Sequence, residues 1–408
     1  MRILIASTTY PPALNGQATF VGNLARGLAG LGHQVLLVVP SDRILSYRAE
    51  SAGVVTEALE SIPIIFWHQA GLFSNLWYQA GYFSLFSGRA VRAIFDSFRP
   101  DIVHIHDHYP LCRVVLHAAM RRSIKTVGTN HFIPENLAGY SRWMASIKPF
   151  SDWLGWRWML EVYNRVDVAT TQSGHAAVLI AQQGLRVPLS PISCGIDLAR
   201  FHPDPSVDRR ACRERYGLDP RRKLFLYVGR VAGEKRLDVL LHALARLARD
   251  DIQLGIAGKG SATEGLKALA KHLKLAGRVQ FTGPIPDADL PVLLNSSDVF
   301  VMPSHAELLS LATLEAMACG RPVLLANAMA LPELVTDGVN GYLFKAGDPL
   351  DAARCMDLLA NQSERWPAIG RAGLERASLH GLDRVVKQYE ALYEELLPAA
   401  PVQSFAST

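Results

Sequence analysis

The sequence has few of the features that mark secreted, membrane-spanning or disordered proteins. Its five cysteines are odd in number, scattered, and show no Cys-x2-Cys spacing, which argues for a reducing compartment and against a structural zinc site. No run of about 18 apolar residues occurs, so we expect no membrane-spanning helix. Charged residues make up 19% of the chain and hydrophobic residues 49%, which excludes a disordered chain and a coiled coil.

The ends and the charge of the chain exclude further classes. Residues 1–6 are strand-like and are followed by turn residues, so we expect no signal peptide and a cytoplasmic protein. The net charge of +5 permits an anionic partner, but the basic residues are too diffuse to predict binding to nucleic acid. A chain of 408 residues is long enough for two or three domains.

The dinucleotide-binding glycine motif is also missing. Residues 2–6 predict a first strand, and a helix and a second strand at 35–39 should follow. The loop at 8–17 lacks Gly-x-Gly-x2-Gly, which removes the main support for a nicotinamide or flavin enzyme.

What the sequence does contain is a pair of glutamates around a predicted helix start. Residues 298–301 are an apolar strand-like run, and a helical pattern begins at Ser310 and stops at Gly320. Glu307 then lies in the loop before the helix, and Glu315 projects from its second turn. A helix N-terminus attracts phosphate, and carboxylates accept hydrogen bonds from sugar hydroxyls. The pattern suits a sugar-phosphate ligand, although glutamates near helix starts are also common as solvent-exposed residues.

Two cations follow an earlier predicted strand. Residues 224–228 are apolar, and Arg230 and Lys235 lie in the turn that opens the next helix. Open α/β sheets bind ligands at the carboxyl ends of their strands. We therefore expect these cations to converge with Glu307 and Glu315 around one diphosphate.

Together the two patterns resemble those of the retaining nucleotide-sugar glycosyltransferases of family 4. The likeness is carried by Gly-Arg-x4-Lys after a strand and by Pro-Ser-x2-Glu-x7-Glu-Ala-Met-Ala-Cys-Gly-x-Pro-Val, and it extends to about residue 397. It implies the α/β GT-B fold, in which two Rossmann-like domains face each other across a cleft and a C-terminal helix crosses back. The expected parts are an acceptor-side domain at 1–197, a nucleotide-sugar domain at 198–376, a crossover helix at 377–397 and a disordered tail at 398–408.

The resemblance also implies which residues hold the donor. Two cations should neutralise the departing diphosphate, while Glu307 binds sugar hydroxyls and Glu315 binds ribose hydroxyls. A glycine matching Gly16 lets the backbone approach the diphosphate, although it could equally be a turn glycine. The remaining donor contacts are expected from Leu309, Ser310 and Leu311.

On the acceptor side, a histidine matching His131 should lie beside the transferred sugar. It completes an expected catalytic set with Arg230, Lys235 and Glu307, unless it is a core histidine. The other acceptor-side residues implied by the resemblance are His106, Asp107, Asn130 and Glu135. The configuration of the anomeric carbon should be retained without a protein base, a metal or another cofactor. His104, His106 and His108 alternate along a predicted strand, but no carboxylate cluster accompanies them, which argues against a metal site.

One departure from the family pattern affects the donor sugar. The family often has Pro-Phe-Gly after the first glutamate, whereas this chain has Leu308-Leu309-Ser310. A serine has less backbone freedom than a glycine. The departure therefore leaves the identity of the donor sugar open. A UDP-hexose is the favoured donor, and GDP-mannose is possible.

Aromatic residues gather at 61–88, which has no charged residue, and at 140–163, where tryptophans alternate with basic residues. This composition suits a membrane interface and suits equally a core beneath long loops. The first interpretation favours a membrane-lipid acceptor, such as diacylglycerol or a glycolipid, and contact with an anionic membrane surface. A soluble or polysaccharide acceptor, a nucleotide-sugar epimerase and a non-catalytic membrane-surface binding module remain alternatives.

Three local predictions concern the second half of the chain. Residues 208–222 are charge-rich and predict a linker with a short helix. Asp287 and Asp289 resemble an Asp-x-Asp metal motif, but helix capping is favoured. Gly258 and Gly260 could allow a loop to approach the nucleotide base.

Overall fold

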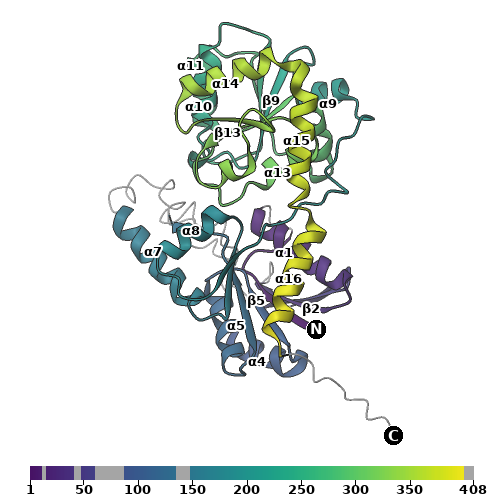
Figure 1. The fold of residues 1–408 in the computed structure, drawn as a ribbon, viewed down its shortest axis with the longest axis vertical. Helices are drawn as coiled ribbons and strands as arrows, with labels where there is room; N and C mark the ends of the chain where they lie inside the picture. The colour runs from purple at the N-terminus through teal and green to yellow at the C-terminus, as the bar shows by residue number, and fades with distance from the viewer. Residues whose placement is uncertain (12–14, 41–46, 60–86, 135–147, 399–408) are drawn as a thin grey trace.

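A computed structural model describes residues 1–11, 15–40, 47–59, 87–134 and 148–398. It has two lobes, one above the other in Figure 1, each built on a β-sheet flanked by helices. The C-terminal helix α16 (Leu382–Leu396) leaves the C-terminal lobe and packs beside α1 (Gly16–Gly30) of the N-terminal lobe. The prediction of two Rossmann-like domains with a returning C-terminal helix is confirmed.

The sheet of the N-terminal lobe has the strand order β3-β4-β2-β1-β5-β6-β7-β8. Every neighbouring pair is parallel except β3 and β4. Its strands are β1 (Arg2–Ala6), β2 (Gln34–Pro40), β3 (Tyr47–Ser51), β4 (Val54–Leu59), β5 (Ile102–Ile105), β6 (Lys125–Thr129), β7 (Val168–Thr171) and β8 (Leu189–Pro191). The helices besides α1 are α4 (Ser87–Phe98), α5 (Pro110–Met120), α7 (Lys148–Tyr163) and α8 (Gly174–Gln182).

The sheet of the C-terminal lobe is parallel throughout, in the order β11-β10-β9-β12-β13-β14. Its strands are β9 (Lys223–Val228), β10 (Ile252–Ala257), β11 (Val279–Gly283), β12 (Val299–Met302), β13 (Val323–Asn327) and β14 (Gly341–Lys345). The α-helices of this lobe are α9 (Arg209–Arg215), α10 (Leu237–Arg246), α11 (Thr263–His272), α12 (Leu290–Ser296), α13 (Leu311–Ala318), α14 (Pro349–Asn361) and α15 (Trp366–Ser378). Short 3-10 turns are η2 (Gly233–Lys235), η3 (Asp287–Asp289), η4 (Leu331–Leu334) and η5 (Ser363–Arg365).

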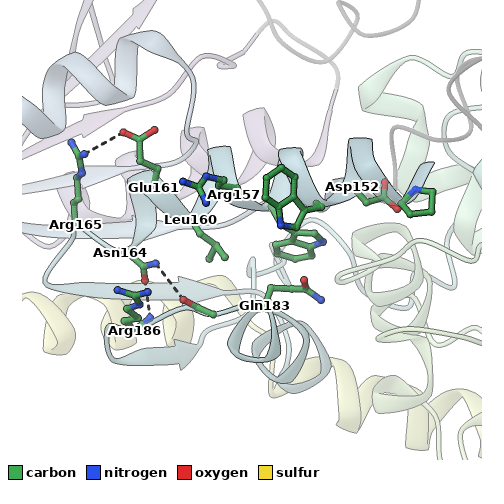
Figure 2. Close-up of a pocket in the computed structure, with 12 residues that line it drawn as sticks. Asp152, Arg157, Leu160, Glu161, Asn164, Arg165, Gln183 and Arg186 are labelled. Atoms are coloured by element: carbon green, nitrogen blue, oxygen red, sulfur yellow. Dashed lines mark hydrogen bonds and ion pairs between the residues drawn. The ribbon is translucent and has the colours of Figure 1, made fainter. Parts of the chain in front are cut away.

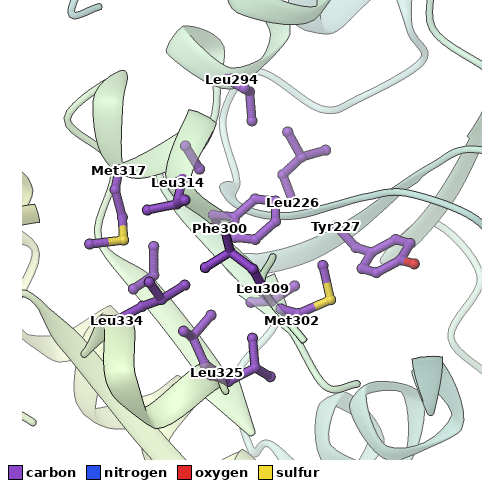
Figure 3. Packing of buried hydrophobic residues seen from close by; sticks show 14 of the residues in the cluster. Leu226, Tyr227, Leu294, Phe300, Met302, Leu309, Leu314, Met317, Leu325 and Leu334 are labelled. Carbon is purple, nitrogen blue, oxygen red and sulfur yellow. The ribbon is translucent and has the colours of Figure 1, made fainter. Parts of the chain in front are cut away.

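The core of the C-terminal lobe fixes the helix that follows β12. Phe300 of β12, Leu226 of β9 and Leu325 of β13 are completely buried at the centre of the sheet. Figure 3 shows Leu314 and Met317 of α13 in the same cluster. Such continuous apolar strands are typical of a parallel sheet covered on both faces. The packing holds the N-terminus of α13 at the carboxyl edge of the sheet.

The chain passes between the lobes at two places, and the two connecting segments are joined by backbone hydrogen bonds. The N–H of Ile196 donates to the carbonyl of His380 at 2.9 Å, and the N–H of Leu382 donates back to Ile196 at 2.8 Å. Beyond the crossing, Tyr389 and Tyr393 of α16 are fully buried in the N-terminal lobe. The Tyr393 hydroxyl is 2.7 Å from Nδ1 of His104. The crossover helix is thus part of the N-terminal core.

The short helix predicted within 208–222 is confirmed as α9, but the prediction that the segment is a linker is wrong, because it is built into the C-terminal lobe. Arg213 of α9 is only 5% exposed and pairs with Asp298 at 2.7 Å. It also donates to the carbonyl oxygens of Ser296 at 2.8 Å and Arg222 at 3.0 Å. Some of the charged side chains that suggested a solvent-exposed linker are therefore buried and paired within the lobe.

Within the described part of the chain, none of the helices is both long and apolar enough to cross a membrane. Residues 60–86, 135–147 and 399–408 lie outside it, and with them Glu135, most of the first aromatic stretch and nearly all of the expected tail.

Candidate active site

The topology places the candidate residues at two switch points. Strand order reverses between β1 and β5 in one sheet and between β9 and β12 in the other. At such a reversal the loops diverge and leave a crevice beyond the carboxyl ends of the strands. The loops after β9 and β12 carry the two cations and Glu307, and those after β1 and β5 carry Gly16 and His106.

Lys235 and Glu307 meet although 72 residues separate them in the chain. The Lys235 Nζ forms an ion pair with Oε1 of Glu307, and the two side chains are 16% and 11% exposed. The backbone also joins these loops, because the N–H of His305 donates to the carbonyl of Glu234 at 3.1 Å. A cation and a carboxylate are therefore held together at the end of the sheet.

Arg230 lies in the same loop and pairs with Glu234. Its backbone carbonyl accepts a hydrogen bond of 2.7 Å from the Tyr227 hydroxyl. The sequence analysis missed Glu234 as a partner. The signal was its place four residues after Arg230 and directly before Lys235, in the turn already marked as functional.

The N-terminus of α13 follows Glu307 by four residues. Ser310 is its N-cap, and the Ser310 Oγ accepts from the N–H of Thr313 at 3.3 Å. This role explains a serine where the family often has glycine. The cap satisfies one N–H only, and the first N–H groups of a helix have no intrahelical acceptor. They remain suited to an anion.

Glu315, on the second turn of α13, is partly buried. Burial raises the pKa of its carboxyl group to about 7, although Arg200 opposes this effect. A carboxylate that is poorly hydrated gains from hydroxyl donors. This environment suits a role in binding hydroxyls.

The first residue of α1 faces the first residue of α13 across the lobes. A Cβ built on Gly16 would lie 3.7 Å from Cδ1 of Leu311. Asn15 caps α1, since its side chain accepts from the N–H of Ala18 at 2.8 Å. The positive ends of two helices thus lie close together, which favours a ligand with more than one negative charge.

His131, after β6, has both ring nitrogens engaged. Nδ1 is 2.6 Å from Nε2 of Gln172, and Nε2 is 3.1 Å from Nδ1 of His106. Burial lowers the pKa of His131 to about 3. The ring is therefore neutral at ordinary pH and a weak base. Gln172 was missed because nothing in its local sequence marks it.

Asp107 and Asn130 serve their own loops. The Asp107 carboxylate accepts from the N–H and the hydroxyl of Thr8 at 2.7 and 2.8 Å and from Tyr109 N–H at 3.1 Å. Burial nevertheless raises the pKa of this group. Asn130 accepts from the N–H of Phe132 at 3.1 Å. Both residues hold the loops around His106 and His131 in shape, and their acceptor-side role stays a prediction.

The structure also bears on the predictions made for Asp289, for Gly258 and for the three histidines of the first lobe. Asp289 makes no capping hydrogen bond to α12, and instead it accepts from the Tyr216 hydroxyl at 2.6 Å. A Cβ on Gly258 would lie 1.9 Å from the carbonyl of Gly229, so loop packing alone requires this glycine. No group of three His, Cys, Asp or Glu within the described ranges could hold a metal ion. His104 is instead bonded to Tyr393 and to Thr129.

Comparisons with known proteins match both lobes. Residues 14–200 match the family model for glycosyltransferase family 4, and residues 208–376 match the model for glycosyl transferases group 1. A D-inositol 3-phosphate glycosyltransferase of Frankia alni is 29% identical over 95% of this chain and 96% of its own length. A protein of the same name from Segniliparus rotundus is 35% identical, over 52% of this chain and 47% of the relative.

Solved structures share the fold. Sucrose-phosphate synthase from Thermosynechococcus elongatus has a TM-score of 0.79 at 20% sequence identity. The match covers 97% of this chain and 99% of that one. Anabaena HepE in complex with UDP-glucose has a TM-score of 0.77 at 20% identity, covering 97% of this chain and all of that one. The chain is thus a glycosyltransferase with the GT-B fold, as the sequence predicted.

Proposed function

We propose that this enzyme transfers a hexose from a nucleotide diphosphate-sugar to an acceptor hydroxyl with retention of configuration. The observation that carries the proposal is the Lys235–Glu307 ion pair beside the N-terminus of α13. It sets a cation for the departing diphosphate next to a carboxylate that binds hydroxyls of the sugar. Both groups are held before substrate arrives, so little reorganisation opposes the reaction.

The donor is held by groups of both lobes. Arg230, Lys235 and the paired helix N-termini neutralise the diphosphate, with Gly16 and the backbone of Leu309 to Leu311 close to it. Glu315 accepts from the ribose, and Glu307 from the hexose. We favour a UDP-hexose over GDP-mannose, and the UDP-glucose complex of the similar Anabaena protein agrees with this choice.

Retention follows if the acceptor attacks on the face from which the diphosphate leaves. The bond from the anomeric carbon to the diphosphate oxygen breaks as the bond to the acceptor oxygen forms. The acceptor's proton passes to the departing phosphate oxygen. His131 and Asp107 are unsuited to take this proton, because their acceptor atoms are already engaged. The chemistry so written requires no further cofactor.

We propose a polyol phosphate as the acceptor, on the ground that the relatives are named for D-inositol 3-phosphate. A membrane lipid is the second candidate. It is favoured by Phe150, Trp153 and Leu154 of α7, which are 62%, 55% and 50% exposed.

The test begins with a thermal-shift screen against UDP- and GDP-sugars, because a ligand at about a hundred times its Kd stabilises the native state by about 2.7 kcal/mol. The donor found is then incubated with inositol phosphate, with lipid vesicles, or without acceptor. NMR of the anomeric proton reports the configuration of the product. We expect a product only with acceptor, and with the donor's configuration. Turnover of the donor alone into an isomeric nucleotide-sugar would indicate an epimerase, and an inverted product would contradict retention.

A further inference from the structure

Helix α7 lies in the N-terminal lobe (Figure 1), and it exposes several large apolar side chains. Phe150 and Trp153 stack on one another with ring centroids 5.9 Å apart, and Leu154 adjoins Trp153 in the chain. All three side chains are at least half exposed. Large apolar side chains gathered on a surface in this way mark a binding face more often than chance.

A pocket of about 730 Å³ adjoins this face (Figure 2). It lies between α7 and the segment that follows α8. Its apolar lining includes Trp153, Trp156 and Leu160, and its charged lining is Asp152, Arg157, Glu161, Arg165 and Arg186. No residue of the candidate active site belongs to it.

The charges around the pocket are positive in excess. Glu161 is neutralised twice, by Arg113 at 2.8 Å and by Arg165 at 3.2 Å. The Arg157 guanidinium lies 5.8 Å from the centre of the Trp153 ring. Arg186 adds a further cation at the other end of the pocket in Figure 2. Arginine next to exposed tryptophan is the combination that binds phosphate above an apolar layer.

We propose that α7 and this pocket dock the enzyme on an anionic phospholipid surface. Phe150, Trp153 and Leu154 enter the boundary between headgroups and acyl chains, where aromatic rings are favoured. Arg157 and Arg186 bind the phosphate oxygens of the headgroups. Contact with a membrane interface needs exposed apolar side chains and nearby cations, and the outer side of α7 has both.

The buried side of α7, which includes two residues that also line the pocket, leads to the candidate active site. Trp156, Met159 and Leu160 are buried in one cluster with Leu308 of the C-terminal lobe. Leu308 directly follows Glu307. A membrane bound at the outer face of α7 would therefore lie one helix away from the loop that carries the catalytic carboxylate. The inference favours the membrane lipid named above as the second candidate acceptor, but docking itself does not depend on the reaction.

A second copy of the chain is a poorer occupant. In a twofold dimer through this face the same surface meets itself. Arg157, Arg165 and Arg186 would then be repeated across the interface, and bringing like charges together without water is costly. Anionic lipid complements these cations instead.

The experiment is flotation of the full-length protein with phosphatidylcholine vesicles, with and without phosphatidylglycerol. We expect binding to the anionic vesicles only, and weaker binding as salt is raised. The variants Phe150→Ser/Trp153→Ser and Arg157→Gln/Arg186→Gln should each lower the bound fraction about tenfold or more. The matched controls are Leu350→Ser, at a residue 66% exposed on the other lobe, and Arg221→Gln, whose side chain is 89% exposed. Both controls should bind as the unchanged protein does.

Three outcomes would overturn the inference: no binding to anionic vesicles, equal loss in the control variants, or a dimer that the α7 variants convert to monomers without any vesicle binding. Donor-induced thermal shifts, measured on the same variants, show that they are folded. If the unchanged protein showed a donor-induced thermal shift but did not bind vesicles, the docking proposal would be wrong, and the proposed transfer reaction would be unaffected.

Discussion

The carboxylate of Glu333 in the C-terminal lobe accepts a hydrogen bond of 3.1 Å from the N–H of Gly174 in the N-terminal lobe. It accepts a second one from the N–H of His175, so it lies on the N-terminus of α8. The turn that carries Glu333 also bonds to the site, because the N–H of Ala330 donates to the carbonyl of Glu307 at 3.2 Å. Contact between the lobes and the position of Glu307 are thus connected.

Replacement of Glu333 by Gln should loosen the contact between the lobes. A carboxylate at an exposed helix N-terminus stabilises by about 0.3–1 kcal/mol, which corresponds to a shift of roughly two- to fivefold between closed and open forms. We expect a larger radius of gyration by small-angle X-ray scattering and a similar loss in kcat/KM. Glu364→Gln, at an exposed site, is the control. Unchanged scattering and kinetics would show that Glu333 does not hold the lobes together.

Loss of a donor cation should act on turnover. Lys235→Ala or Arg230→Ala is expected to lower kcat by on the order of a hundredfold or more, because one preorganised charge at the leaving group is lost. The measurement is steady-state kinetics with saturating donor. Lys267→Ala, at an exposed position on α11, is the control. A kcat within threefold of the unchanged enzyme would remove these residues from the mechanism.

Glu315 should make stability depend on pH in a particular direction. Its pKa of about 7 in the folded protein lies above the ordinary 4.5, so the folded state holds the proton more tightly. Stability then falls as the pH rises from about 4.5 to 7. Glu315→Gln should be more stable than the unchanged protein at pH 8, by up to roughly 3 kcal/mol, and not at pH 4. Denaturant unfolding at the two pH values measures this, with Glu264→Gln as the exposed control. An equal difference at both pH values would contradict the raised pKa.

Buried histidines should give the opposite dependence at acid pH. Burial lowers the pKa of His108 and of His131 to about 3, below the ordinary 6.5. The unfolded chain therefore binds more protons, and stability falls as the pH drops below 6.5. Each of these histidines should lower the free energy of unfolding by about 2 kcal/mol at pH 5. His131→Gln should lose less stability between pH 7 and pH 5 than the unchanged protein, whereas the exposed His272→Gln should not differ from it. If both variants behave alike, His131 is not held neutral.

The ion pair between Arg213 and Asp298 should matter for stability. Arg213→Ala removes the buried one of the two arginine partners of Asp298 and leaves Arg209 in place. We therefore expect a loss of stability below the roughly 3–5 kcal/mol that is typical of a buried charge left without any partner. The control is Arg210→Ala, which removes an exposed pair with Glu214 and should cost at most about 1 kcal/mol. Thermal unfolding compares the two. If Arg213→Ala and Arg210→Ala had equal melting temperatures, the buried ion pair would not stabilise the fold, and the segment at 208–222 would behave as a linker.

The sequence by itself determined the elements and the ends of strands at which the site lies. Strand β12 is apolar throughout, strand β9 is apolar after Lys223, and Ser310 begins a helix by local hydrogen bonding, so these elements are visible within a few residues. The family pattern then predicted that Lys235 and Glu307 come together. It could not predict which neighbours hold them.

Only the tertiary structure decided those partners. Gln172 reaches His131 from 41 residues away, Asp298 reaches Arg213 from 85, and Glu333 reaches Gly174 from 159. No periodicity relates such positions, since each contact depends on how two separate elements pack. The same holds for α7, whose aromatic residues fitted a core and a surface equally well. Packing against Leu308 buries Trp156 and leaves Phe150 and Trp153 exposed, because a helix can turn only one face to its neighbours.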